Sequence, residues 1–145
     1  MIASTDTKAA YENLVKNFAR LWQTKDISIV REIVAHDAVA HWAGTGTFSG
    51  AEYPERARVV MHELLPDVVT EVTGHATDGK HVFISWHSRA TIAGQPIEWD
   101  GINRFRLRGD LADEVVAIYD TAPLTRVFQE AQPYLEAEID RRNPQ

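Results

Sequence analysis

The sequence predicts an α+β fold, in which three N-terminal helices pack on one face of a curved, cone-shaped antiparallel sheet and a C-terminal helical extension follows. Three segments between residues 7 and 65 include apolar residues at helical spacing, whereas residues 68–119 alternate apolar and polar residues at the period of strands. The chain of 145 residues, with 44% hydrophobic and 25% charged residues, has the size and composition of one domain, expected to span residues 1–145. A sheet wrapped around helices can leave a pocket that the side chains do not fill.

The helices are predicted in the first half of the chain and at its end. Residues 7–23 place one apolar stripe along a helix. A shorter helix is predicted after Asp26, and a third, over residues 53–65, ends before a proline, which disfavours helix in the residue that precedes it. From Leu124 onward, apolar spacing predicts the C-terminal helical extension, which Pro133 divides into two pieces.

The strands are predicted mainly in the second half. A short strand is expected over residues 37–42, and the glycine-rich residues 44–50 are expected to form a loop. Four further strands are separated by turns rich in glycine, proline and aspartate: residues 68–77, 80–92, 97–107 and 114–119.

The hairpin from Glu98 to Asp120 organises the predicted sheet. In the last strand Val116, Ile118 and Asp120 share a face, and because two of the three are apolar, that face is predicted to point inward. This orientation places the carboxyl group of Asp120 in an apolar interior. Alternation in the preceding strand predicts an inner face of Trp99, Gly101, Asn103, Phe105 and Leu107 and a solvated outer face of Arg104, Arg106 and Arg108, with Arg89, Thr91 and Tyr119 on outer faces of neighbouring strands.

Composition limits the classes of function. The sequence contains no cysteine, which excludes disulfides, thiolate metal sites and cysteine nucleophiles. The net charge of −6 disfavours a nucleic-acid surface, which needs clustered lysine and arginine. No apolar run reaches the length of a membrane span and the first residues lack the features of a secretory signal, so we expect no membrane partner and a cytoplasmic location. The six histidines do not follow a metal-binding motif, and we expect no metal or other cofactor.

A family resemblance rests on short motifs spread over nearly the whole chain: Asp26 with Val30, Ser49-Gly50, Pro66-Asp67, Gly79 and the hairpin from Ile102 to Asp120. With these motifs the chain resembles the NTF2-like superfamily and, within it, the SnoaL-like polyketide cyclases. The resemblance implies the cone-shaped fold just described. It leaves the activity open, because the superfamily contains isomerases, epoxide hydrolases, dehydratases, cyclases and members without catalysis.

The activities of the superfamily differ in the residues they require. The resemblance places the catalytic positions of ketosteroid isomerases on Phe18, Trp42 and Asn103, so that set is missing here. Of the three catalytic residues of limonene-epoxide-hydrolase-like enzymes, one matches Asp120 and two are absent. The resemblance to SnoaL-like cyclases matches their acid/base aspartate to Asp120 and their pocket histidine to Asn103.

Asp120 and Asn103 are therefore the candidate catalytic residues. A carboxyl group in an apolar interior suits proton transfer near neutral pH, and the Asn103 amide can orient a substrate carbonyl although it cannot carry a proton. Two alternatives stay open: Asp120 caps the segment that follows its strand, and Asn103 is a buried amide that satisfies backbone groups. The predicted substrate-binding wall, whose aromatic members are equally typical of an ordinary core, consists of Tyr11, Phe18, Trp42, Trp86, Ser88, Trp99, Phe105 and Ile118.

These observations indicate a cofactor-free SnoaL-like enzyme that performs acid/base chemistry (cyclisation, isomerisation or dehydration) on a small hydrophobic, carbonyl-bearing substrate in an apolar pocket. The alternative is a non-catalytic protein of the same fold that binds a small hydrophobic ligand. An epoxide hydrolase of the limonene-epoxide-hydrolase type is a third candidate, less favoured than these two. We also expect a homodimer formed through the outer face of the sheet.

Overall fold

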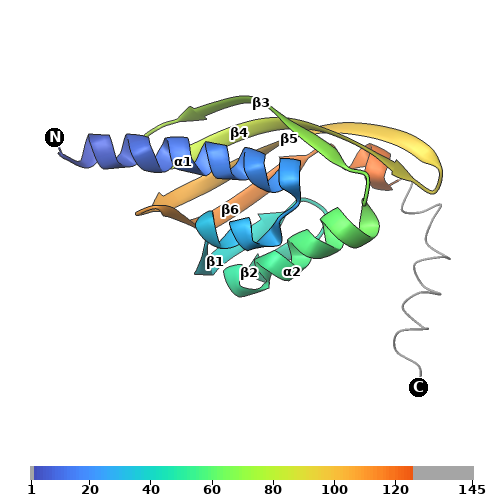
Figure 1. Cartoon of the computed structure of the whole chain (residues 1–145), viewed down its shortest axis with the longest axis horizontal. Coiled ribbons are helices and arrows are strands. Elements are labelled where there is room, and N and C mark those ends of the chain that lie inside the picture. The colour runs from blue at the N-terminus through green and yellow to red at the C-terminus, as the bar shows by residue number, and fades with distance from the viewer. Residues whose placement is uncertain (1, 126–145) are drawn as a thin grey trace, which may run out of the picture.

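The computed structural model describes residues 2–125, with side chains from residue 7 onward. One six-stranded sheet, in the order β2-β1-β6-β5-β4-β3, curves over the helices, which lie against one of its faces (Figure 1). This arrangement confirms the predicted α+β class. The apolar stripes of the helices and the inner face of the sheet meet in one core, in which Leu14, Met61, Ile84 and Phe105 are among the most deeply buried side chains.

The three predicted helices are present. The first, α1 (Ile2–Thr24), runs along β3 beneath the sheet, and the short helix after Asp26 is the 3₁₀ helix η1 (Ile27–Glu32). Asp26 caps η1, since its Oδ1 accepts a hydrogen bond from the Ser28 N–H at 3.1 Å. The third helix begins with a turn of 3₁₀ helix, η2 (Gly50–Glu52), and continues as α2 (Tyr53–Arg58) and the π-helix η3 (Val59–Leu64).

The strands include one that the sequence did not predict. The expected strands are β1 (Val34–Trp42), β3 (Val69–Thr77), β4 (His81–Ile92), β5 (Gln95–Arg108) and β6 (Leu111–Tyr119). The expected loop over residues 44–50 is wrong in part, because β2 (Gly46–Ser49) pairs antiparallel with β1 there. Gly44 and Gly46, at φ +79° and +89°, make the tight turn between the two strands. The sheet is also mixed, because β1 runs parallel to β6.

The inward face of β6 differs from the prediction. Val115 and Ala117 are buried, whereas Ile118 is 66% exposed and Asp120 is exposed. Register explains the difference, because Ala117 pairs with the buried Asn103 of β5 and directly paired residues point to the same face. The prediction that Val116, Ile118 and Asp120 face the interior is therefore wrong. It failed because the outer face of this strand is also apolar.

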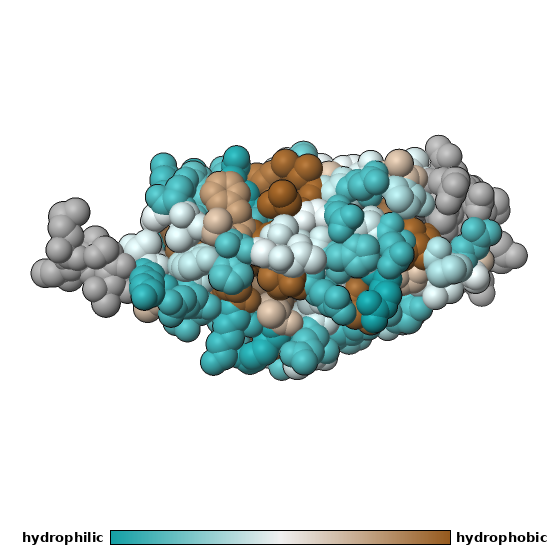
Figure 2. Space-filling view, turned by 90° about the horizontal axis from the view of Figure 1, so that it is seen from above, coloured by the Kyte–Doolittle hydropathy of each residue, from teal (hydrophilic) through white to brown (hydrophobic). Residues whose placement is uncertain are grey.

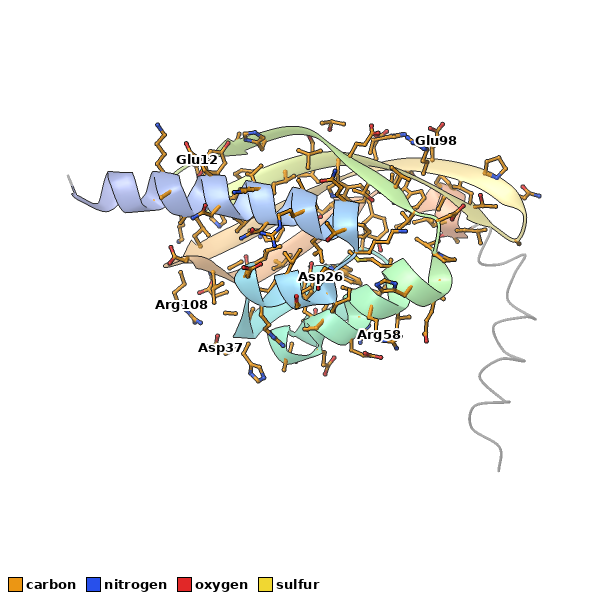
Figure 3. The ribbon with its side chains drawn as sticks, viewed as in Figure 1. Glu12, Asp26, Asp37, Arg58, Glu98 and Arg108 are labelled. Carbon is orange, nitrogen blue, oxygen red and sulfur yellow. The ribbon has the colours of Figure 1, made fainter. Side chains whose placement is uncertain are left out.

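The outer face of the sheet carries both ion pairs and apolar side chains. The three outward arginines of β5 are paired, as predicted for a solvated row: Arg104 with Glu114 at 3.2 Å, Arg106 with Asp113 at 2.7 Å, and Arg108 with Asp37. Figure 3 shows Arg108 and Asp37 together at one end of the molecule. Viewed from above the sheet, apolar side chains form groups among the polar ones (Figure 2).

The described residues end in one helical turn, residues 122–125, in which Leu124 is buried. The predicted extension from Leu124 therefore begins within the described residues, whereas its remainder, with the division at Pro133, lies outside them. Within residues 2–125, no helix is long and apolar enough to cross a membrane.

Candidate functional site

The inner face of the sheet and the helices enclose a cavity of about 690 Å³. Strands β1, β3, β4, β5 and β6 supply one wall, and the end of α1 with residues 51–65 supplies the other. Cavities of this size accommodate a small organic molecule, and a mostly apolar wall with a few polar groups is typical of such sites. Six of the predicted site residues meet here: Phe18, Trp42, Trp86, Ser88, Trp99 and Asn103.

Trp86 and Asn103 form the polar centre of the cavity. The Trp86 indole N–H donates a hydrogen bond to Asn103 Oδ1 over 2.9 Å, and both side chains are buried. Indole nitrogen is only a donor, so this contact fixes which end of the amide faces Trp86 and which is the NH₂.

The NH₂ group of Asn103 is available to a ligand. Its oxygen takes the Trp86 bond, no second partner is present among the described residues, and no fully buried side-chain nitrogen or oxygen of those residues lacks a partner. The nitrogen therefore keeps access to the cavity that Asn103 lines. An amide N–H₂ in an apolar cavity offers two donors to an acceptor such as a carbonyl oxygen.

Gly101 gives Trp86 its place. The two residues pair across β4 and β5, and a Cβ added at Gly101 would lie 2.3 Å from Cζ2 of the Trp86 ring. The indole therefore lies flat over the backbone of β5, where a larger residue than glycine would displace it. This close approach directs the indole N–H toward Asn103, two residues along the same strand.

A second polar group lies on the same inner face. The hydroxyl groups of Thr70 on β3 and Ser88 on β4 are 2.6 Å apart and both residues line the cavity. Ser88 was predicted as a site residue, and it shares a strand face with Trp86. Thr70 was not predicted, because its place beside Ser88 depends on the pairing of β3 with β4, which the local sequence pattern does not specify.

Two tyrosines of the wall were also missed as site residues. Tyr53 packs edge-on against Trp42, with ring centroids 5.4 Å apart, and burial raises its pKa to about 12, opposed in part by a hydrogen bond from Trp42. Tyr119, predicted on an outer face, lines the cavity, and its hydroxyl donates to the Ala43 carbonyl over 2.6 Å. Burial also raises the pKa of Tyr119. Both phenols are therefore neutral at physiological pH. The sequence signal that Tyr119 points inward is that it shares a strand face with Val115 and Ala117.

Charged side chains lie at the rim of the cavity. Glu52, Glu55 and Arg56 belong to the lining, but their side chains are 59%, 66% and 42% exposed. Hydrogen bonds from Arg58 lower the pKa of Glu55, which stays ionised as the partner of that arginine. Among the described residues that line the cavity, the groups away from the rim are apolar, hydroxyl, amide or indole groups.

Asp120 does not reach this cavity. It is exposed and borders a shallow groove on the outer face, and its Oδ1 accepts a hydrogen bond from the Ala122 N–H at 3.1 Å. This contact confirms the capping alternative for the segment that follows β6. The predicted apolar surroundings of Asp120 are therefore wrong, and its carboxylate is separated from Asn103 by the sheet.

Three other predicted ligand contacts lie outside the cavity. Tyr11 extends from α1 to β3, where its hydroxyl contacts Nδ1 of His75. Phe105 is buried in the core against Phe18, with ring centroids 5.8 Å apart. Ile118 is on the outer face, for the same register reason as Asp120. As for metals, no three histidine, aspartate or glutamate side chains within residues 7–125 could together hold an ion.

The fold is a curved mixed sheet packed on helices, with a mostly apolar cavity between the two layers. The family to which the chain belongs is that of the SnoaL-like domain, whose model matches residues 15–115. None of the curated proteins compared with the chain matches it.

Solved structures share the fold at low identity. One is wild-type IdmH, a proposed polyketide cyclase from Streptomyces antibioticus (19% identity, TM-score 0.69, 82% of this chain and 98% of that chain covered). A second is an NTF2-like protein of unknown function from Burkholderia pseudomallei (14%, 0.73, 81% and 96%). A third, from Catenulispora acidiphila, has a ketosteroid isomerase-like fold and was solved in complex with trimethylamine (19%, 0.68, 79% and 90%).

Proposed function

We propose that this protein binds a small, largely apolar molecule that carries a carbonyl group, and that the Asn103 NH₂ donates a hydrogen bond to the carbonyl oxygen. The observation that carries this proposal is the fixed Trp86–Asn103 pair, whose free NH₂ faces a cavity of about 690 Å³ walled by aromatic rings. A ligand that covered this donor without an acceptor would leave it buried and unpaired, which costs free energy that a carbonyl oxygen avoids. Flat rings would pack on the indoles of Trp86 and Trp99.

The test compares two probes of the same shape, para-acetylbiphenyl and para-ethylbiphenyl, by isothermal titration. The acetyl compound should bind more tightly by roughly two- to twelve-fold, the range expected of one net hydrogen bond. Asn103→Leu should abolish this preference but still bind para-ethylbiphenyl, which shows that the cavity persists. Asn13→Leu, on the exposed side of α1, is the matched control and should keep the preference. Equal affinity of the wild-type protein for the two probes would contradict the proposal.

A second candidate function is cofactor-free, cyclase-type catalysis on the same kind of ligand. Membership of the SnoaL-like family favours it, as does a neutral donor placed where a carbonyl oxygen gains negative charge on enolisation. Asp120 has no part in this proposal, because it lies on the other side of the sheet. Any proton would instead pass to or from water in the cavity.

Exchange of the acetyl methyl protons of para-acetylbiphenyl in D₂O, followed by NMR, separates catalysis from binding. A catalyst should accelerate the exchange, and Asn103→Leu should lower the acceleration while Asn13→Leu leaves it unchanged. Binding without acceleration would leave the protein as a binding protein.

We further propose that two copies pair through the outer face of the sheet. Ile118 and Ile102 are 66% and 50% exposed and lie opposite each other on β6 and β5, beside a groove bordered by Phe83 and Val116. Adjacent exposed apolar side chains of this kind favour a subunit contact. Sedimentation should show a dimer that Ile118→Lys dissociates and Asn13→Lys does not. A wild-type monomer at micromolar concentration would refute this pairing.

A further inference from the structure

Two polar groups of the cavity, the Asn103 amide and the Thr70–Ser88 hydroxyl pair, lie at separate positions along the inner face of the sheet. Asn103 on β5 pairs with Ile84 on β4, whereas Ser88 pairs with Trp99 of β5 and with Thr70 of β3. Ser88 lies four residues beyond Ile84, so at about 3.4 Å per residue the backbone positions that carry the two polar groups are ~14 Å apart along the strands. Figure 3 labels Glu98, near the start of β5, and Arg108, at its end. The hydroxyl pair lies toward the Glu98 end, because Ser88 pairs with Trp99.

The surface between these polar groups is apolar. Trp86 and Gly101 form the row between them, and the indole covers the glycine backbone. Trp99 borders Ser88 on the same face, and Val60 of η3 lines the opposite wall. A ligand that reaches from Asn103 to the hydroxyl pair therefore lies along the Trp86 ring, with apolar side chains above it.

The two ends have different hydrogen-bonding chemistry. The Asn103 NH₂ only donates, so it selects an acceptor. The Thr70–Ser88 pair holds two hydroxyl protons, of which one serves the bond between them. The other proton and the unused lone pairs can serve a ligand group that accepts or donates. A hydroxyl group of a ligand can therefore bind at this end as well as a carbonyl group.

We propose that the ligand of this cavity is an elongated, rigid, apolar molecule with an oxygen at each end: a carbonyl held by Asn103 and a hydroxyl or second carbonyl held by Thr70 and Ser88. After a hydrogen bond of about 3 Å is allowed at each end, the two oxygens lie on the order of 10 Å apart. The inference rests on the proposed function, since it adds a second polar contact to the same site.

The test adds a hydroxyl group to the far para position of para-acetylbiphenyl and measures both compounds by isothermal titration. The added hydroxyl should tighten binding to the wild-type protein roughly two- to twelve-fold, the worth of one further hydrogen bond. The double variant Thr70→Val with Ser88→Ala should lose this gain and keep the affinity for para-acetylbiphenyl.

The chain offers a matched control on the same two strands. Thr73 and Ser85 form an equivalent hydroxyl pair, 2.9 Å apart, but Ser85 pairs with Ile102 on the outer face of the sheet. Thr73→Val with Ser85→Ala makes the same chemical change and should keep the full gain from the added hydroxyl.

The outcomes separate this inference from the function on which it rests. If para-acetylbiphenyl binds with an Asn103-dependent preference but the added hydroxyl gives no gain, the two-ended ligand is wrong and the proposed function stands. The same conclusion follows if the gain survives in the Thr70/Ser88 double variant. If para-acetylbiphenyl shows no preference over para-ethylbiphenyl, the proposed function itself fails.

Discussion

Replacing Gly101 by alanine tests the geometry of the site most directly. The added Cβ would lie 2.3, 2.6 and 2.8 Å from three carbons of the Trp86 ring, well inside van der Waals contact. The indole must therefore tilt away from β5, and its N–H must leave Asn103 Oδ1, which it now contacts at 2.9 Å. We expect Gly101→Ala to destabilise the fold and to weaken binding of para-acetylbiphenyl.

The size of the effect follows from three contributions. Forcing a methyl group into a packed site costs about 1–3 kcal/mol, and loss of the buried hydrogen bond adds about 1 kcal/mol. Restricting the unfolded chain by replacing glycine returns about 0.4–1 kcal/mol. The free energy of unfolding should therefore fall by roughly 1–3.6 kcal/mol, which lowers the Tm by about 2–14 °C for a chain of this size.

Urea unfolding followed by far-UV circular dichroism measures the loss, and the NMR signal of the Trp86 indole N–H reports the broken bond. Gly74→Ala is the matched control, since Gly74 is also a strand glycine and its added Cβ would meet only the Ser85 hydroxyl, at 3.1 Å. Gly74→Ala should leave the indole signal in place. An unchanged midpoint together with an unchanged indole signal in Gly101→Ala would refute the account of how Trp86 is placed.

Three further predictions concern single side chains. Asp120→Asn should leave binding of para-acetylbiphenyl unchanged within twofold, because the residue lies outside the cavity and an amide oxygen can still cap Ala122; a larger loss by titration would show that Asp120 contacts the ligand. Backbone N–H groups of His81 and Lys80 lower the pKa of Asp78 from 3.8 to about 2. The stabilising contribution of Asp78 is therefore complete above pH about 4 and is lost as the pH falls toward 2. Asp78→Asn should reduce the dependence of the unfolding free energy on pH over that range. Burial raises the pKa of Tyr53 from 10.0 to about 12, so its contribution to stability is complete below pH 10 and is lost as the pH rises toward 12. Tyr53→Phe should reduce the decline in the unfolding free energy over that range. An equal decline in both proteins would contradict the burial argument.

The elements of the fold were predictable where one face of an element is clearly apolar and the other clearly polar. In β5, tryptophan and phenylalanine alternate with arginine, and the predicted inner face is the observed one. In β6, Val115 and Ala117 alternate with Val116 and Ile118, so both faces are apolar and the sequence pattern does not show which face points inward. Only the pairing with β5 decides between them, and pairing is a property of the folded sheet.

The site was predictable to the same extent. Trp86, Trp99 and Asn103 follow from alternation within single strands, and the structure brings them to one cavity. Thr70 and Tyr53 do not, because each becomes a site residue only through a neighbour distant in sequence: Ser88 for Thr70, and Trp42 for Tyr53. The short strand β2 was missed because its glycines and threonines are as typical of a loop as of a tight hairpin.

The identity of residue 103 decides what chemistry the cavity can support. The resemblance places an ionisable group at this position in ketosteroid isomerases and SnoaL-like cyclases, whereas this chain has an amide. Trp86 can only donate, so the amide oxygen faces it and the NH₂ is left for the cavity. With the proposed ligand bound, the two hydrogen bonds would form a relay with one fixed direction. A relay of this kind polarises a ligand oxygen at every pH but transfers no proton. Replacing the amide by an acid of the same shape, Asn103→Asp, should therefore make the affinity for para-acetylbiphenyl fall as the pH rises and the carboxyl group ionises, whereas the wild-type affinity stays constant. A wild-type affinity that varies steeply between pH 6 and 8 would show that an ionisable group, and not the amide, controls the site.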